Sequence, residues 1–243
     1  MIKLGIYLAE RGLIPDFILG FFIKKISLAR VSSASIEKEK QIVINELKSG
    51  PIAEKTSDAN DQHYEVPPAF FELVLGKHMK YSCSQFDSKS DDLDQAEQNM
   101  LQLYLDRAGI QANQNILDLG CGWGSFSLFA AAKFPTSKFT AVSNSKDQIN
   151  FINEEAAQRG LKNLTAIQKN INKMHFNETF DKVISIEMFE HMRNYESLLS
   201  KVSNFLKPDG ELFVHIFCHR FACYLYEAKN DSDWMTKNFF EGG

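Results

Sequence analysis

The chain has 243 residues, of which 44% are hydrophobic and 24% are charged, enough for one sizeable core plus an appended segment. The formal net charge of −4 and a pI near 5.9 argue against a general nucleic-acid-binding protein and give no attraction to anionic membranes. The four cysteines form no C-x-x-C pair and the N-terminus resembles no cleaved signal, so a cytoplasmic protein with reduced thiols is predicted.

The first 55 or so residues show the apolar spacing of three and four that is typical of helices. The longest apolar run, Leu13 to Ile23, contains Pro15 and is too short to span a bilayer. Its aromatic side chains predict a helix that packs within the protein, as core or as a lid. Peripheral contact with a membrane surface is the alternative, without stable insertion. A second amphipathic helix is predicted for residues 36–47.

Residues 63–86 combine many aromatic side chains with small polar ones. The two prolines at 67 and 68 predict the start of a short helix, followed by a loop. The side chains predicted to face inward are Phe70, Phe71 and Leu73 to Leu75. On physical grounds alone, a packed aromatic cluster is the alternative to a functional site here. A capped amphipathic helix is predicted next, for residues 91–108.

The stretch NILDLGCGWGS, residues 115–125, predicts a buried strand, a glycine turn and the start of a helix. Asp118 stands near the end of the strand. Gly120, Gly122 and Gly124 allow a tight turn, positive φ angles and close approach of the backbone to a ligand. This arrangement places free helix N–H groups at the carboxyl edge of a parallel sheet, where open α/β folds bind ligands.

The spacing of these glycines is G-x-G-x-G, whereas a dinucleotide site would show G-x-G-x-x-G. With Asp118 two residues before the first glycine, the pattern resembles the first motif of class I S-adenosylmethionine methyltransferases. The resemblance implies that Asp118 and the glycine backbone hold the amino acid end of that cofactor. An ordinary tight turn in an α/β protein is the alternative.

After the glycine turn, strands and helices alternate, which predicts a parallel sheet with helices on both faces. A helix at residues 146–159 is expected to end at Gly160. A turn at residues 207–210 is expected before the last strand. The further strands are predicted at residues 139–142, 164–168, 182–186 and 211–217.

Seven motifs in order resemble the cyclopropane-fatty-acid synthase superfamily, and within it the coclaurine and pavine N-methyltransferase branch. They are HYEVPPAFFELVLG, KYSCSQF, LDLGCGWGSFS, SNSKDQ, FDKVISIEMFEHMRNYE, LKPDGELFVHIFCH and DSDWMTKNFFEGG. The resemblance implies a class I methyltransferase, Rossmann-like domain at 91–243 with a helical cap at 1–90. Relatives continue beyond the last motif, so C-terminal strands are expected to be missing and an apolar sheet edge to be exposed.

The resemblance also implies a set of cofactor-binding residues. Where many methyltransferases place an acidic residue for the ribose, this chain has Asn144 and Gln148, one helical turn apart. Asn170 stands where the family usually has an aspartate next to the adenine. Its amide oxygen accepts a hydrogen bond more weakly than a carboxylate does. The other positions implied to line the cofactor site are Ser82, Gly120, Ile171 and Ile186.

The motif SIEMFEHM follows the fourth strand and supplies Glu187, Glu190 and His191 at the substrate edge of the sheet. A helix starting here would put the three side chains on one face. For methylation of a small-molecule amine, the nitrogen must be held close to the methyl group as the free base. Glu190 and His191 are expected to orient and deprotonate it, with Glu187 in support and Tyr81 shaping the pocket.

Two alternatives remain open. In related lipid synthases, residues matching Cys83, Glu190, His215 and Ile216 bind a bicarbonate ion, which accepts a proton after methylation of an alkene. These positions are compatible here, so a cyclopropane-fatty-acyl-phospholipid synthase is the first alternative, and an inactive cofactor-binding module is the second. A metal pair at His215 and His219 lacks the further ligands that zinc needs, so no metal is expected.

Overall fold

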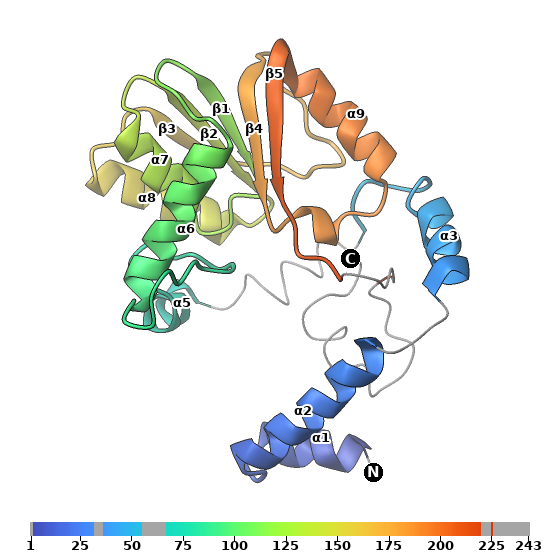
Figure 1. Cartoon of the computed structure of the whole chain (residues 1–243). Helices are drawn as coiled ribbons and strands as arrows, with labels where there is room; N and C mark the ends of the chain where they lie inside the picture. The colour runs from blue at the N-terminus through green and yellow to red at the C-terminus, as the bar shows by residue number, and fades with distance from the viewer. Residues whose placement is uncertain (1, 32–35, 55–66, 220–224, 226–243) are drawn as a thin grey trace.

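The structure, a computed structural model, describes residues 2–31, 36–54, 67–219 and 225. Its centre is a parallel sheet with the strand order β3-β2-β1-β4-β5 (Figure 1). All five predicted strands are present. Their bounds are Asn115–Leu119 for β1, Lys138–Ser143 for β2, Leu164–Gln168 for β3, Phe180–Ile186 for β4 and Leu206–His215 for β5.

The last strand differs from its predicted bounds of 211–217. The segment 207–210, predicted as a turn before the strand, lies within β5 as an irregularity in its pairing with β4. Pro208 lacks an N–H group and cannot continue a regular ladder, which accounts for the irregularity. Among the described residues β5 is an edge of the sheet, and its side chains are partly buried or exposed. The strands expected to be missing stay a prediction.

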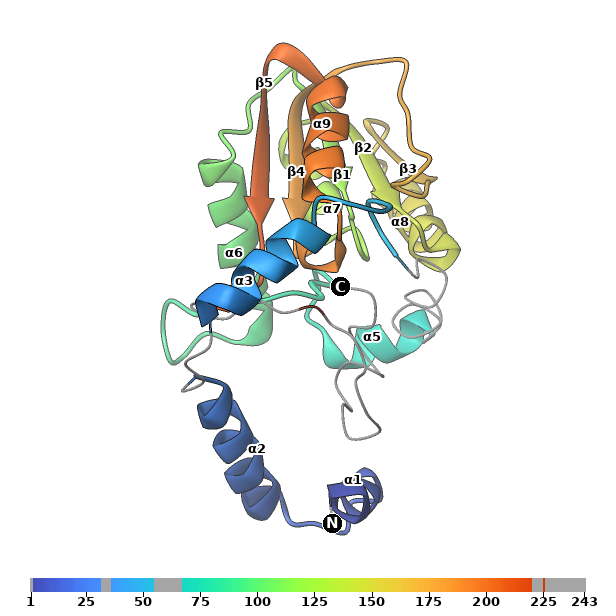
Figure 2. The ribbon, with the colours of Figure 1, turned by 90° about the vertical axis from the view of Figure 1, so that its right-hand side faces the viewer.

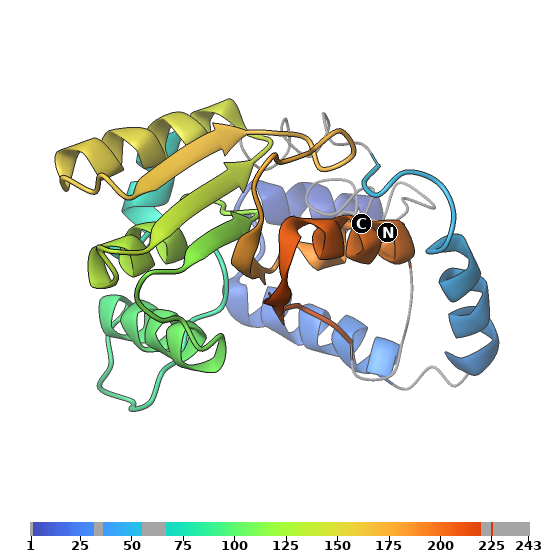
Figure 3. The ribbon, with the colours of Figure 1, turned by 90° about the horizontal axis from the view of Figure 1, so that it is seen from above.

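The strands alternate between two hydrophobic clusters, one on each face of the sheet. Ile116 and Ile184 belong to the first cluster, with side chains of α6, α7 and α8, whereas Leu117 and Val183 belong to the second, with α9. Figure 3 shows α6 and α9 on opposite sides of the strands. The bounds are Leu93–Arg107 for α6, Ser125–Lys133 for α7, Lys146–Gln158 for α8 and Tyr195–Phe205 for α9.

The strand order creates a crevice at the carboxyl edge of the sheet. The chain runs from β1 outward through β2 to β3, then returns to the other side of β1 to form β4 and β5. The loops after β1 and β4 therefore leave the sheet in opposite directions, and open α/β sheets bind ligands at such a switch point. Both predicted site motifs follow these two strands: residues 118–124 after β1 and residues 187–191 after β4.

The N-terminal residues form the predicted helices α1 (Ile2–Glu10), α2 (Asp16–Val31) and α3 (Ile36–Glu46). Helices α1 and α2 lie beyond the rest of the fold (Figures 1 and 2). The predicted packing of α2 within the protein is wrong for Phe17, Phe21 and Phe22, which are 56–78% exposed. Membrane contact stays a prediction. Among the described residues, no helix combines the length and apolarity needed to cross a bilayer.

The segment after α3 joins the sheet domain through backbone hydrogen bonds. The N–H of Arg193 donates to the carbonyl of Ile52 at 2.8 Å, and that of Tyr195 to Leu47 at 3.1 Å. The side chain of Asn172 also pairs with both backbone groups of Ala53, at 2.8 and 3.1 Å. These bonds bring residues 47–54 against the loops that follow β3 and β4.

Helix α5 (Pro68–Val74) begins at the predicted proline, but it buries less than predicted. Only Phe71 is buried, against Trp123 and Met79, while Phe70, Leu73 and Val74 are about half exposed or more. A seven-residue helix presents one narrow stripe to the core, so its neighbouring apolar positions remain outside. The inward orientation predicted for these three side chains is therefore wrong.

Glu97 on α6 holds the loop that follows α5. Its fully buried carboxylate accepts backbone N–H groups from Gly76 at 2.9 Å, His78 at 2.9 Å and Lys80 at 3.3 Å. We expect Glu97→Gln to lower the free energy of unfolding by about 1–3 kcal/mol, because the new amide donor faces N–H donors. Urea unfolding measures the change, with the α8 variant Glu155→Gln as control. Equal stability of both variants would contradict the assigned role.

Candidate active site

The turn after β1 has the backbone that its glycines predict. Gly120, Gly122 and Gly124 all have positive φ, at 85°, 52° and 79°. A Cβ atom on Gly120 would lie 2.5 Å from Met188, and one on Gly124 would lie 2.6 Å from Ile152. A Cβ on Gly122 would meet no atom within 4 Å. Two of the glycines therefore allow close packing, and the third leaves space beside the pocket.

This difference predicts distinct effects of alanine at two of the glycines. Gly122→Ala should cost only about 1–2 kcal/mol of stability, the cost of a left-handed residue, but should weaken binding of S-adenosylmethionine at least about tenfold by filling ligand space. Gly124→Ala should mainly destabilise the fold, because its methyl group overlaps Ile152. Calorimetric titration and thermal unfolding of both variants separate the effects. Unchanged affinity in Gly122→Ala would refute the placement of the ligand.

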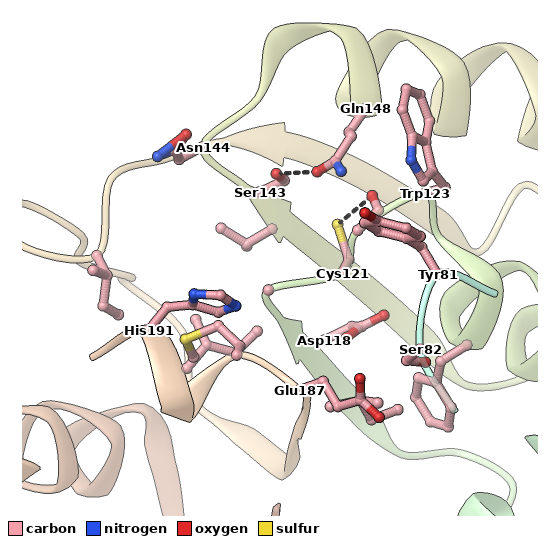
Figure 4. Close-up of a pocket in the computed structure, with 18 of the residues that line it drawn as sticks. Tyr81, Ser82, Asp118, Cys121, Trp123, Ser143, Asn144, Gln148, Glu187 and His191 are labelled. Atoms are coloured by element: carbon pink, nitrogen blue, oxygen red, sulfur yellow. Dashed lines mark hydrogen bonds between the residues drawn. The ribbon is translucent and has the colours of Figure 1, made fainter. Parts of the chain in front are cut away.

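A pocket opens at the switch point, and the glycine turn, which carries Cys121 and Trp123, is part of its lining (Figure 4). Its walls include apolar side chains that the sequence analysis did not single out, such as Met79, Val142 and Met192. Gly124, Asn170, Cys83, Glu190 and His215 lie outside the lining. The predicted site residues that line it are Tyr81, Ser82, Asp118, Gly120, Gly122, Asn144, Gln148, Ile171, Ile186, Glu187 and His191.

Asp118 is a buried carboxylate in the wall of this pocket. The hydroxyl of Ser127, in the first turns of α7, donates to its Oδ2 at 2.6 Å. Burial raises the pKa of Asp118 to about 7, against an ordinary value of 3.8, and the Ser127 hydrogen bond opposes this rise only in part. The ionised form is therefore costly in the free protein and would be stabilised by a cation in the pocket.

The loop after β2 presents an oriented amide. The hydroxyl of Ser143 donates to Oε1 of Gln148 at 2.6 Å, and Ser145 caps α8 through the N–H of the same glutamine. The Nε2 group of Gln148 is buried and has no hydrogen-bond partner among the described residues. A buried donor without a partner is unfavourable. We therefore expect this Nε2 group to donate a hydrogen bond to an acceptor atom of a ligand in the pocket.

Trp123 is a pocket residue that the sequence analysis missed. Its indole is 1% exposed, packs against Phe71 and Phe151, and leaves Nε1 without a partner among the described residues. The feature of the sequence that could have identified Trp123 is its place inside the glycine turn, where a large side chain is unusual. Together with Gln148, it gives the pocket two buried N–H donors for a polar ligand.

Asn170 lies beside the pocket. Its Oδ1 accepts the backbone N–H of Asn172 at 2.9 Å, which shapes the loop after β3. The nearby apolar wall is formed by Ile171, and Lys201 fixes its carbonyl at 2.9 Å. The predicted contact of Asn170 with an adenine ring stays a prediction.

Glu187 stands directly after β4 with a positive φ of 49°, a strained conformation for a non-glycine residue. Its N–H donates to the carbonyl of His215 at 2.8 Å, and its Oε1 accepts the N–H of Cys83 at 3.1 Å. The Nδ1 of His215 lies 4.0 Å from the same oxygen. Three predicted residues from distant parts of the chain thus meet, because β4 and β5 are neighbours in the sheet.

The predicted helix face bearing Glu187, Glu190 and His191 does not form. A short 3₁₀ helix, η1 (Phe189–His191), follows β4 instead, and its three residues direct the side chains differently. His191 lines the pocket, whereas Glu190 accepts the N–H of Phe217 at 3.3 Å. Burial raises the pKa of Glu190 to about 7. This carboxyl group can therefore exchange a proton near neutral pH.

Residues 53–243 match the family model described as mycolic acid cyclopropane synthetase. The chain belongs to this family. Its fold is that of a class I methyltransferase, as predicted, and the superfamily resemblance noted from the motifs is confirmed.

Curated relatives in this family act on different acceptors. The chain is 39% identical over 241 residues to (S)-coclaurine N-methyltransferase of Thalictrum flavum subsp. glaucum, covering 96% of this chain and 66% of the relative. It is 27% identical to the cyclopropane-fatty-acyl-phospholipid synthase of Escherichia coli (strain K12), over 75% of this chain and 45% of the relative. The chain thus spans about two thirds or less of these two proteins.

Solved structures show the same division. Coclaurine N-methyltransferase bound to N-methylheliamine and SAH superimposes with a TM-score of 0.89 at 36% identity, covering 97% of this chain and 70% of that chain. Mycolic acid cyclopropane synthase CmaA1, complexed with SAH and CTAB, gives a TM-score of 0.60 at 26% identity, over 67% of this chain and 57% of that chain. The family membership therefore leaves two classes of methyl acceptor.

Proposed function

We propose that this protein is an S-adenosylmethionine-dependent methyltransferase that methylates the nitrogen of a small-molecule amine. The observation that carries the proposal is the meeting of two groups at one switch point. The Asp118 carboxylate and the glycine turn, which follow β1, line the same pocket as Glu187 and His191, which follow β4 (Figure 4). A methyl donor and an acceptor would thus bind side by side.

The residues present fit S-adenosylmethionine. Asp118 suits the ammonium of its amino acid part, and the space beside Gly122 admits a ligand close to the backbone. Gln148 and Trp123 hold buried donors, and Ile171 and Ile186 supply apolar walls for a planar ring. When bound, the cofactor supplies an electrophilic methyl group on a sulfonium.

On the acceptor side, the protein has to bind an amine and remove its proton. Glu190, with its pKa raised to about 7, can take a proton from an ammonium group near neutral pH. His191 lines the pocket and can orient the nitrogen. Glu187, held by the N–H of Cys83, supplies a negative charge that attracts the cationic form of the substrate. Positioning contributes most, because methyl transfer itself needs no acid.

The relatives support an amine as the acceptor. Coclaurine and pavine N-methyltransferases match this chain at 35–39% identity, whereas the bacterial lipid synthase matches at 27%. The rim of the pocket carries the aromatic ring of Tyr81, about half exposed and packed edge-on against Phe71. Such a ring suits an amine that is itself attached to an apolar or aromatic group.

Methylation of unsaturated lipid is the second candidate. It is favoured by the contact of Cys83 Sγ with His215 Nε2 at 3.9 Å, because the family resemblance assigns both residues to a bicarbonate site. In that reaction the bound anion, and not Glu190, would accept the proton. The pair is equally compatible with the amine reaction.

Incubation with S-adenosylmethionine carrying a labelled methyl group tests the proposal. A panel of secondary and primary benzylic or phenethyl amines and vesicles of unsaturated phospholipid are offered in parallel, with and without bicarbonate. We expect label in the amine fraction and mass spectra with one added methyl group. Label in cyclopropane lipid without an amine product would overturn the proposal. Cofactor binding without any turnover would instead support an inactive binding module.

A further inference from the structure

Lys80 is a buried lysine that the proposed reaction does not use. The residue is 2% exposed, and it lies directly before the Tyr81–Cys83 turn at the rim of the pocket. Its ammonium group donates to Ser82 Oγ, to the carbonyl of Cys83 at 2.6 Å and to Tyr104 Oη at 3.2 Å. These three acceptors use all three hydrogens of the ammonium group.

The hydroxyl of Tyr104 links Lys80 to His215. Because an ammonium group can only donate, the hydroxyl of Tyr104 accepts from Lys80 and is free to donate to His215 Nδ1, 2.8 Å away. When Tyr104 donates to Nδ1, the hydrogen of the neutral imidazole is on Nε2, which lies 3.9 Å from Cys83 Sγ. The backbone N–H of Cys83 in turn donates to Oε1 of Glu187 at 3.1 Å. This series of contacts thus leads from Lys80 to Glu187.

We propose that Lys80 and Tyr104 are positioning residues of the active site. Lys80 holds the Tyr81–Cys83 turn in place, so that the N–H of Cys83 faces Glu187, and Tyr104 selects the Nε2–H tautomer of His215, which faces the sulfur of Cys83. This inference rests on the proposed function for its kinetic consequence. The hydrogen-bond chain itself stands on the distances alone.

The charges around Lys80 agree with this role. Burial lowers its pKa to about 8, while Cys83, Glu187 and Glu97 oppose the change. Burial also lowers the pKa of His215, as do Lys80 and Arg107, against the opposing effect of Glu187. At pH 7 the lysine is therefore mostly charged and the imidazole neutral, which is the state that the chain of donors requires.

The first test is the tautomer of His215, which needs no turnover. Two-bond ¹H–¹⁵N correlation spectra of imidazole-labelled protein, assigned by the missing signals of His215→Gln, should show the Nε2–H form at pH 7. Tyr104→Phe should move His215 toward the Nδ1–H form, since Nδ1 loses its donor. A wild-type Nδ1–H tautomer, or no change in Tyr104→Phe, would overturn the inference.

The second test is kinetic. Lys80→Met and Tyr104→Phe should lower kcat roughly 10- to 100-fold, with the KM and Kd for S-adenosylmethionine within about twofold of wild type for Tyr104→Phe. Lys182→Met is the matched control, since this buried lysine pairs with Glu211 at the opposite edge of the sheet. It should leave kcat unchanged. Unaltered kcat in both site variants would contradict a positioning role.

The proposed function and the hydrogen-bond chain can be refuted independently of each other. If the wild-type protein methylates neither amines nor lipids, the proposed function is lost, but the tautomer spectra still decide the hydrogen-bond chain. If Lys80→Met does not fold, Tyr104→Phe carries the kinetic test, because it removes one hydroxyl and leaves the bonds from Lys80 to the turn in place.

Discussion

Asp118→Asn is expected to weaken binding of S-adenosylmethionine by roughly 30- to 1,000-fold, the cost of removing one charge from a buried hydrogen-bonded pair. The asparagine keeps an oxygen that can accept from Ser127, 2.6 Å away in the native protein, so the local packing changes little. The loss should therefore fall on the interaction with the cofactor ammonium group. The same loss is expected for S-adenosylhomocysteine, which carries that group too.

The same substitution should stabilise the free protein at alkaline pH. The folded-state pKa of Asp118 is raised to about 7 from 3.8, mainly by burial, so the folded protein holds the charged form at a cost. That cost is largest above pH 7 and disappears as the pH falls toward 4, because the folded state then takes up a proton that the unfolded state does not. A shift of this size corresponds to at most roughly 4 kcal/mol.

Calorimetric titration at pH 8 and urea unfolding between pH 4 and 8 measure both effects of Asp118→Asn. Asp147→Asn, at an exposed position on α8, is the control and should alter neither. An asparagine variant that binds the cofactor normally would show that Asp118 does not hold the ammonium group. Equal stability of variant and wild type at pH 8 would show that the carboxylate is not desolvated.

Glu190→Gln is expected to lower kcat for amine methylation roughly 100- to 10,000-fold, the usual contribution of a positioned general base. Glutamine preserves an oxygen that can accept the N–H of Phe217, which Glu190 binds at 3.3 Å, but it cannot take a proton. The affinity for S-adenosylmethionine should stay within about threefold, because Glu190 lies outside the pocket lining.

The pH profile gives a second measure of Glu190. Because burial raises its pKa to about 7 and the ionised form is the base, kcat of the wild-type enzyme should rise with pH up to about 7 and level off above it. In the glutamine variant, this rise of kcat with pH should disappear. Steady-state rates between pH 5.5 and 9 test the prediction, with Glu196→Gln on α9 as a control. If kcat of Glu190→Gln still rises with pH, the rise reports the titration of another group.

Much of the fold follows from local patterns. The strand over residues 164–168, the Ser145 cap and the glycine turn were predictable because each depends on neighbours in the sequence. The burial of α2 and α5 was not predictable, because the sequence of an apolar helix does not show which part of the protein covers it. Phe17 and Leu73 are as apolar as core residues, yet they are 78% and 86% exposed. Long-range packing decides such positions.

The site divides in the same way. The sequence by itself determined the glycine turn of the proposed cofactor half, because its glycines need a particular backbone over a few residues, and that requirement is visible as spacing. Only the tertiary structure decided the acceptor half. Glu187, Cys83 and His215 come together through the pairing of β4 with β5, while Lys80 and Tyr104 behind them meet through the packing of a loop on α6. Contacts between residues so far apart in the chain leave no local pattern in the sequence.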